Sequence, residues 1–158
     1  PANISNIGLY YAQPLTEKNV KVKLSDVSVK DWKTVGMPAE AANAIDGDPQ
    51  TVWTAKALTP LVVDMGKASE VIGFSYAPAQ KEDLTGTIYK YNFYVSIDGK
   101  NWTKCDAGGE FSNIMHNPVP YFVRFGKKYP ARYFKLEPVA EINNKPATTV
   151  GEVGILLK

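Results

Sequence analysis

Hydrophobic and polar residues alternate with a period of two over much of the chain. The clearest case is 89–98, whose hydrophobic face would comprise the odd positions Tyr89, Tyr91, Phe93, Val95 and Ile97. Because successive side chains of a strand point to opposite faces, the segment is expected to be a strand with one buried face. Asp98-Gly99 follows as a hairpin turn signal, and Trp102 is expected to open the returning strand.

Further segments repeat the pattern and are separated by Gly, Pro, Asn and Asp. They are 61–66, 70–77, 119–125, 132–138 and 152–157, with a weaker one at 26–32. This succession of short strands predicts an all-β sandwich or barrel. The one helical candidate is 38–45, where Pro38 suits a first helical turn. We expect one β-sandwich domain over 26–158 and an N-terminal extension, 1–25, toward a preceding domain.

Composition narrows the classes of function. A chain of 158 residues with 44% hydrophobic and 22% charged residues fits one globular domain. A net charge of +2 argues against duplex nucleic-acid binding and against strong attraction to acidic membranes. Cys105 is the one cysteine, which excludes an intrachain disulfide and a Cys-based metal site. No apolar run approaches the roughly 20 residues of a membrane helix. The chain begins at Pro1, so we interpret it as a piece of a longer protein.

The acidic loop NAIDGDPQTVW (43–53) has a composition that suits a hard cation. Asp46 offers a carboxylate, Thr51 offers a hydroxyl and a carbonyl, and Gly47 permits backbone angles that let carbonyls converge. Calcium takes six to eight such oxygens at about 2.3–2.6 Å. The loop is not an EF-hand, because its glycine falls at the second position and Ala57 stands where the glutamate belongs. A metal-free Asx turn at Asp46 is the alternative.

Six motifs, in this order, resemble coagulation factor V/VIII type C (discoidin-like) domains. They are AIDGDPQTVW, VVDMG, GFSYAP, YNFYVSIDGKNW, ARYFKLEP and GEVGI. The chain is most similar to the family 32 carbohydrate-binding modules of secreted bacterial glycoside hydrolases, over about Val27 to Leu157. The resemblance implies a galactose-binding-domain-like jelly roll of about eight antiparallel strands.

The resemblance also implies a buried structural Ca²⁺ beside the acidic loop. Its ligands would be two carboxylates together with backbone and hydroxyl oxygens, which nearly neutralise the ion. By position these are the carbonyls of Asn43, Asp48 and Gly151, the carboxylates of Asp46 and Glu152, and the carbonyl and hydroxyl of Thr51. On this interpretation the metal outweighs the Asx turn.

In the resembling modules a sugar binds the loops at one end of the sandwich, here 54–60, 77–86, 108–117 and 141–149. Galactose-binding members carry a glutamate, a histidine and an arginine there. This chain departs at all three, with Ala44 for the glutamate, no histidine in 54–60 and Ala79 for the arginine. A galactose specificity carried by those groups is therefore not expected.

Sugars bind by stacking on aromatic rings and by hydrogen bonds to their hydroxyls. The candidate ligand-binding residues are Lys56, Gln80, Tyr89, Phe111, Asn113 and His116, with Phe111 as the candidate stacking platform. The other large aromatic residues are expected in the core: Trp53, Trp102, Phe93, Phe125 and Phe134, with Trp32 packed at an edge.

No catalytic residue is predicted. His116 has no serine or cysteine partner in a recognisable motif, and Asp46 and Glu152 are better used as calcium ligands. The function expected from the resemblance is a non-catalytic carbohydrate-binding module, monomeric, secreted, periplasmic or on the cell surface, covalently linked to a hydrolase domain and bound to a glycan. The alternatives are a structural spacer without a sugar site, and a discoidin-like protein or phospholipid binder that uses Leu58 beside Lys56. Neither nucleic-acid binding nor membrane insertion is expected.

Overall fold

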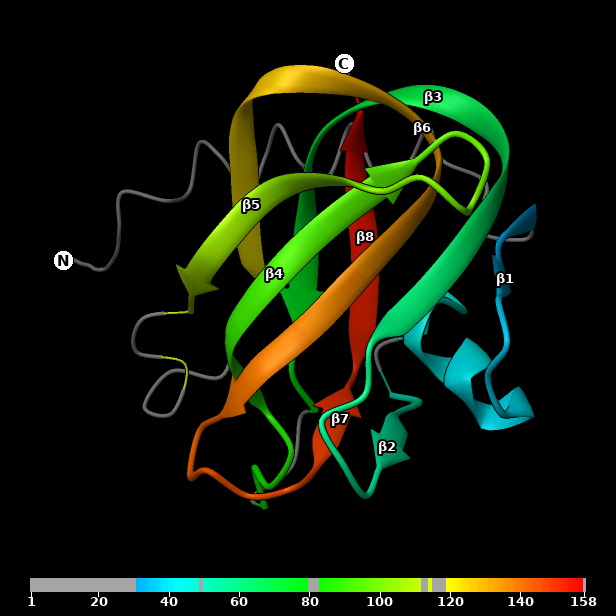
Figure 1. Ribbon diagram of the computed structural model, residues 1–158. Coiled ribbons are helices and arrows are strands. Elements are labelled where there is room, and N and C mark those ends of the chain that lie inside the picture. Colours follow the sequence, from blue (N-terminus) through cyan, green and yellow to red (C-terminus); the bar gives the residue numbers. More distant parts are fainter. Residues whose placement is uncertain (1–30, 49, 80–82, 112–113, 115–118, 158) are drawn as a thin grey trace, which may run out of the picture.

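The computed structural model describes residues 31–48, 50–79, 83–111, 114 and 119–157. Within them the chain forms eight strands and a short 3-10 helix (Figure 1). The strands are β1 (Lys33–Thr34), β2 (Trp53–Ala55), β3 (Leu61–Ala77), β4 (Ile88–Ser96), β5 (Thr103–Glu110), β6 (Tyr121–Glu141), β7 (Thr148–Val150) and β8 (Glu152–Leu157). The fold is the expected antiparallel β-sandwich. In the described part no helix is long and apolar enough to cross a bilayer.

Two long strands, β3 and β6, build both layers of the sandwich. In the first layer the strand order is β1-β3-β6-β4-β5, with residues 61–64 of β3 paired to 133–136 of β6. In the second layer residues 69–77 of β3 pair with 121–131 of β6 and with β8. Both strands curve over the upper end of the molecule between these pairings (Figure 1). The short ribbon β2-β7 lies at the lower end.

The segments expected as separate strands at 61–66 and 70–77 are one strand, and so are those at 119–125 and 132–138. Gly66 and Gly126 have φ angles of 86° and 81°, which only glycine adopts without strain, so each strand bends without ending. The expectation of a strand at 26–32 is wrong for its described residues, since the nearby strand β1 begins at Lys33. Strands β2 and β7 were not expected, because three residues show no alternation.

Aromatic rings from the two layers meet in the core. Phe74 of β3 stacks on Phe93 of β4 with ring centroids 4.2 Å apart, and Phe93 also stacks on Phe134. Trp32, expected to pack at an edge, is 7% exposed and belongs to the core, where its ring meets that of Phe134 in a T-shaped contact. The list of expected core aromatics holds for Trp53, Phe93 and Phe134, while Phe125 is only partly buried against the core. Trp102 lies outside the core, a correction considered below.

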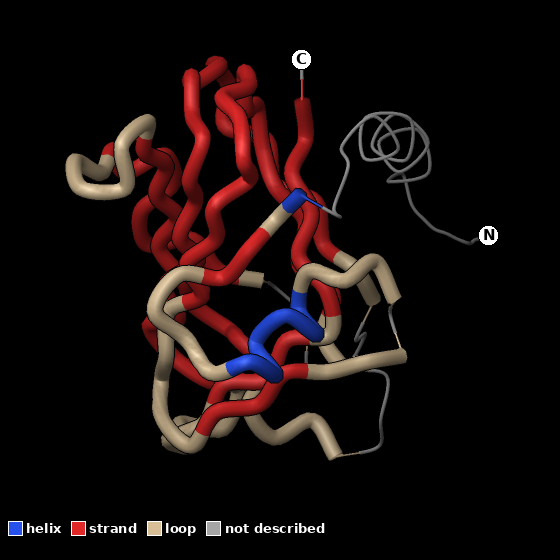
Figure 2. The backbone as a smooth tube through the Cα atoms, turned by 90° about the vertical axis from the view of Figure 1, so that its right-hand side faces the viewer, coloured by secondary structure: helices blue, strands red, loops and turns tan. Residues whose placement is uncertain are grey.

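The helical segment expected at 38–45 forms one short 3-10 helix, η3 (Ala39–Ala44). Pro38 precedes it, and Ala41 and Ala44 are its buried residues. The small alanine side chains let this turn pack closely against its neighbours, and the acidic loop follows directly. Figure 2 shows the helix and several loops in the lower part of the molecule, away from the C-terminus, together with short stretches of strand.

Candidate functional site

Oxygen atoms of the acidic loop converge on the hydroxyl of Thr51. Thr51 Oγ1 lies 3.3 Å from the Asn43 carbonyl oxygen and 3.0 Å from the Asp48 carbonyl oxygen, and it also contacts Asp46 Oδ2. A hydroxyl has one proton and can donate it to only one of these three acceptors. The loop therefore concentrates more oxygen acceptors than its own donors satisfy.

Glu152 brings a second carboxylate to the same loop from the start of β8. Its Oε2 accepts a hydrogen bond of 2.9 Å from the amide of Gly47, whereas its Oε1 is buried and has no hydrogen-bond partner among the described residues. Burial raises the pKa of Glu152 to about 8, and the negative charge of Asp46 also raises it, against the lowering effect of the Gly47 amide. A bound cation would oppose this unfavourable burial of charge.

Local backbone chemistry holds the loop in this shape. Gly47 has a φ of 80°, and Asp46 Oδ1 accepts the amide of Asp48, so the Asx turn expected as the alternative is present. The turn uses Oδ1 of Asp46 and leaves its Oδ2 directed to Thr51. The turn is therefore compatible with a metal ion bound to Oδ2. Close packing also requires Gly151, because a Cβ there would lie 2.8 Å from the carbonyl oxygen of Pro78.

The donor set fits a calcium ion. The converging atoms are oxygens, from carboxylates, carbonyls and a hydroxyl, and one buried carboxylate oxygen lacks a partner among the residues that the structure describes. Between residues 31 and 157, masked gaps aside, no three His, Cys, Asp or Glu side chains gather as a metal cluster. The candidate site depends on backbone carbonyls instead, and a ligand set of this kind cannot be recognised from side chains alone.

A hollow of about 430 Å³ lies at the same end of the sandwich. It is lined by Leu58, Val139, Ala140, Glu141, Asn144, Lys145 and Pro146. Thr148 connects the two loops around it, because its hydroxyl donates to the Ala57 carbonyl and accepts the Thr59 amide. The hollow combines exposed apolar surface at Leu58 and Val139 with the polar side chains of Asn144 and Lys145.

The buried carboxylate of Glu141 shapes the wall of this hollow. It is 2% exposed and accepts hydrogen bonds from the amides of Gly86, Asn143 and Lys145. These three bonds fix the loop after β6 to the segment before β4. Sequence reasoning named the 54–60 and 141–149 loops as ligand loops, but it considered Leu58 for a lipid contact alone and missed Val139.

The expected ligand-binding residues have different placements. Lys56 is exposed on the loop that carries Leu58. Tyr89 is partly exposed and donates a hydrogen bond of 2.7 Å to Glu110, which raises the pKa of Tyr89. The expectation for Phe111 is wrong: it is 2% exposed and packs on Tyr76 and Tyr91, so it offers no stacking platform. Three others lie outside the described residues: Gln80, Asn113 and His116.

The two alanines that replace sugar-binding groups of the resembling modules are buried. Ala44 is 0% exposed and Ala79 is 2% exposed. Neither residue presents a polar atom of its side chain to this end of the molecule. A ligand here would therefore have to use other residues.

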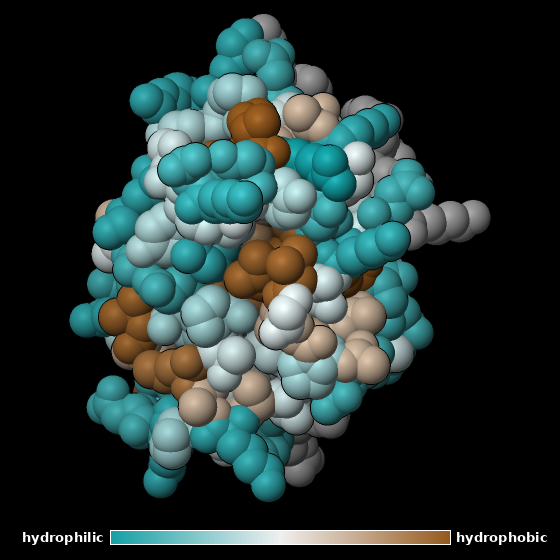
Figure 3. Space-filling view, turned by 45° about the vertical axis from the view of Figure 1, so that its right-hand side comes forward, coloured by the Kyte–Doolittle hydropathy of each residue, from teal (hydrophilic) through white to brown (hydrophobic). Residues whose placement is uncertain are grey.

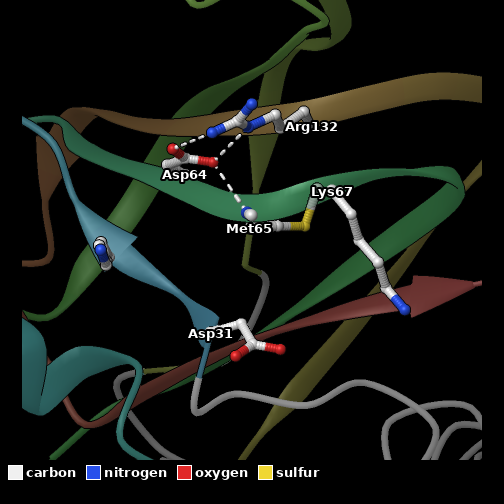
Figure 4. A pocket seen from close by; sticks show the side chains of 7 residues that line it. Asp31, Asp64, Met65, Lys67 and Arg132 are labelled. Carbon is white, nitrogen blue, oxygen red and sulfur yellow. Dashed lines mark hydrogen bonds and ion pairs between the residues drawn. The ribbon is translucent and has the colours of Figure 1, made fainter.

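Another hollow, of about 400 Å³, lies between β1 and β3 (Figure 4). Asp64 and Arg132 form a two-point ion pair on one side of it, with distances of 2.8 and 2.9 Å. Asp31 and Lys67 lie on the opposite side of β3 from this pair. The hydrogen bonds of Arg132 lower the pKa of Asp64, although burial acts in the opposite direction.

Comparison with known proteins places the chain in a family. The sequence model of the F5/8 type C domain matches residues 23–153. Galactose oxidase of Gibberella zeae is 29% identical over 143 residues, which cover 83% of this chain and 20% of that protein. Sialidase of Micromonospora viridifaciens is 24% identical over 143 residues, 85% of this chain and 21% of that protein. The chain thus spans about a fifth of the length of the curated relatives it matches.

Solved structures share the fold. The family 32 carbohydrate-binding module of Clostridium perfringens NanJ, in complex with galactose, superposes with a TM-score of 0.67. It is 20% identical, and the alignment covers 82% of this chain and 96% of that module. At this identity the likeness establishes the sandwich architecture.

Proposed function

The chain belongs to the F5/8 type C domain family, and from that premise we propose that it is a non-catalytic carbohydrate-binding module with a structural calcium ion. The observation that carries the proposal is the hollow beside Leu58 and Lys145, at the end of the sandwich that holds the acidic loop. Its volume falls in the range of about 300–1,000 Å³ of small-molecule sites.

The lining of the hollow suits a saccharide. Leu58, Val139 and Pro146 provide apolar surface for the C–H face of a pyranose, and Asn144 and Lys145 provide groups for its hydroxyls. The galactose complex of the NanJ module supports the assignment by likeness of fold. The buried alanines at positions 44 and 79 imply a set of sugar contacts different from that of galactose-binding members.

Calcium would be held by Asn43, Asp46, Asp48, Thr51 and Glu152, together with Gly151 beside it. Bound there, the ion would supply positive charge to the two carboxylates and tie the acidic loop to β8. Two contacts within the chain then hold the loops at the lower end in position: β8 pairs with β3, and Thr148 accepts a hydrogen bond from Thr59 in the 56–60 loop. The ion would not contact the sugar.

Tethering is the role we infer for the module. The curated relatives are five times longer than the matched segment, and they include an oxidase and a sialidase that act on sugars by name. Linked to a secreted or surface enzyme such as a glycoside hydrolase, the module would hold the enzyme on a glycan. The enzyme would then act at a raised local concentration of its glycan substrate. Several weak sugar-binding sites in one protein bind a glycan more tightly than one site does.

The test is binding of saccharides to the calcium-loaded domain. A glycan array followed by calorimetry with galactose and N-acetylgalactosamine should give binding that Leu58→Ala and Lys145→Ala each weaken severalfold. Lys100→Ala, in the hairpin turn after β4, is the control and should bind as the wild type does. Binding unaffected by both loop variants would contradict the location of the site.

A structural spacer with the same fold is the second candidate. The observation in its favour is the burial of Ala44 and Ala79, which removes two polar groups of the resembling modules. A calcium-loaded domain that binds no saccharide on the array would support the spacer and reject the carbohydrate-binding function.

A further inference from the structure

The outward face of the first layer carries a second group of aromatic and polar side chains. Strand pairing places Tyr94 of β4 opposite Lys135 of β6 and Lys104 of β5, and it places Asn92 opposite Glu137. Their chain neighbours Phe93 and Leu136 point into the core. We call the outward group the sheet-face patch; it consists of Asn92, Tyr94, Trp102, Lys104, Lys135 and Glu137.

Lys135 is held between two aromatic rings of this patch. Its Nζ lies 4.6 Å from the centroid of Tyr94 and 4.7 Å from that of Trp102. Lys104 Nζ lies 5.6 Å from the Tyr94 centroid. Trp102 is partly exposed here, which corrects its expected place in the core. The reason is its position before β5, where alternation directs it to the outward face.

The cations of the patch have no carboxylate within ion-pair distance among the described residues. An aromatic ring attracts an ammonium group by about 0.5–1 kcal/mol at an exposed site, but it accepts no strong hydrogen bond. The three N–H groups of each lysine are therefore still available as hydrogen-bond donors. Lys135 and Lys104 are thus ready to pair with an external anion.

Glu137 and Asn92 add fixed polar groups next to these cations. Glu137 Oε1 accepts from Asn92 Nδ2 at 2.9 Å and from the Tyr94 hydroxyl at 3.2 Å. Asn92 Oδ1 in turn accepts the amide of Gly108. Within the described part this network leaves Glu137 Oε2 and one N–H of Asn92 without a partner. Those groups are arranged as one acceptor and one donor, which suits neighbouring hydroxyls.

We propose that the sheet-face patch is a second saccharide site, specific for a pyranose that carries a carboxylate. Lys135 and Lys104 pair with the carboxylate of a uronic or sialic acid, Trp102 stacks on the C–H face of the ring, and Glu137 with Asn92 binds hydroxyls. Figure 3 shows, on the face that it presents, a mostly hydrophilic surface with separate hydrophobic patches.

The experiment compares acidic saccharides with their neutral counterparts by calorimetry on the full chain. Trigalacturonate is paired with α-1,4-galactotriose, and 3′-sialyllactose with lactose, so that each pair isolates the acidic group. At least one acidic saccharide should bind more tightly than its counterpart, and added salt should weaken that binding because the contact is ionic. If neither acidic saccharide binds, or if acidic and neutral forms bind equally, the proposal is wrong.

Matched variants locate the site. Lys135→Gln and Trp102→Ala should each weaken binding of the acidic saccharide about tenfold, a loss typical of one charged or aromatic contact. The control is Lys127→Gln, because Lys127 Nζ also lies over a tyrosine ring, 5.0 Å from Tyr129, but on the other layer. An equal loss in the control, or none in Lys135→Gln, overturns the proposal. Lys135→Gln leaves the rings in place, so it tests the site even if Trp102→Ala unfolds.

The two proposed sites fail separately. Leu58→Ala and Lys145→Ala should leave binding to the sheet-face patch unchanged, and Lys135→Gln should leave binding of a neutral sugar at the loop-end hollow unchanged. If the wild type binds an acidic saccharide but no neutral sugar, the function proposed for the loop-end hollow is rejected and the proposal for the sheet-face patch stands.

Discussion

At the scale of single residues, one carboxylate connects the two ends of the candidate metal site. Glu152 accepts a hydrogen bond from the amide of Gly47, 105 positions earlier in the chain, and its other oxygen is buried with no partner in the described part of the chain. A buried carboxylate without a cation is costly, whereas the same group beside Ca²⁺ is favourable. The metal assignment therefore predicts that a substitution at Glu152 changes the stability of the domain in a direction that depends on whether calcium is present.

Replacing Glu152→Gln should abolish stabilisation by calcium. With saturating calcium the wild type should gain about 2.7–4.1 kcal/mol, because a ligand at 100 to 1,000 times its Kd stabilises by that amount. In EDTA the variant should be at least as stable as the wild type, since a neutral amide avoids burying a charge. Thermal unfolding with calcium and with EDTA measures both. Glu110→Gln, exposed at the end of β5, is the control, and an equal calcium effect in both variants would disprove the assignment.

The ion pair of Asp64 with Arg132 predicts a pH dependence of a different kind. The pKa of Asp64 is lowered below its ordinary 3.8, chiefly by hydrogen bonds from Arg132. The pair therefore stabilises the fold fully above pH 3.8 and loses this contribution as the pH falls through the lower folded-state pKa. The difference in Tm between wild type and Asp64→Asn should thus shrink on acidification below pH 3.8. A Tm difference between wild type and Asp64→Asn that stays constant with pH would contradict this role of the ion pair.

At the scale of elements, the pairing of β3 with both β6 and β8 in the second layer depends on close backbone contact. The register shifts between Val71 and Gly73, where β3 faces both β6 and β8. A Cβ at Gly73 would lie 2.1 Å from the Val123 carbonyl oxygen and 2.9 Å from a methyl group of Leu156. The neighbouring strands leave no room for a side chain at this point.

Gly73→Ala should consequently destabilise the domain by about 1–3 kcal/mol, because the added methyl must displace backbone of β6. Urea unfolding monitored by circular dichroism measures the change. Ala68→Ser, exposed on the same strand, should change stability by less than about 0.5 kcal/mol. A wild-type midpoint for Gly73→Ala would show that β6 yields easily here.

At the scale of the whole molecule, the aromatic stack joins the layers into one cooperative unit. Phe93 contacts Phe74 of the second layer and Phe134 of the first, and it is 0% exposed. Because β3 and β6 belong to both layers, neither layer can lose its pairing without affecting the other.

Phe93→Ala should lower the free energy of unfolding by about 3–5 kcal/mol, and the variant should still unfold in a single transition. Tryptophan fluorescence and circular dichroism should give coincident unfolding curves in both proteins, as expected of a two-state domain. Two separated transitions in the wild type would contradict the joint behaviour of the layers.

The sequence alone was sufficient for the strands with strong alternation and for the acidic loop. Alternation over 89–98 predicted β4, the segment 152–157 coincides with β8, and the composition of 43–53 marked the oxygen-rich turn. These features are local, because alternation of hydrophobic and polar residues, and a glycine between two carboxylates, can both be recognised from consecutive residues.

The tertiary structure alone decided which faces are exposed and which distant residues meet. Nothing in consecutive residues shows that β3 and β6 continue through their bends, that Phe111 is buried, or that Trp102 faces outward beside Lys135. Glu152 reaches Gly47 only because β8 pairs with β3. Burial and contact are properties of the neighbours supplied by other strands, so the same alternating pattern can end in the core or at a binding surface.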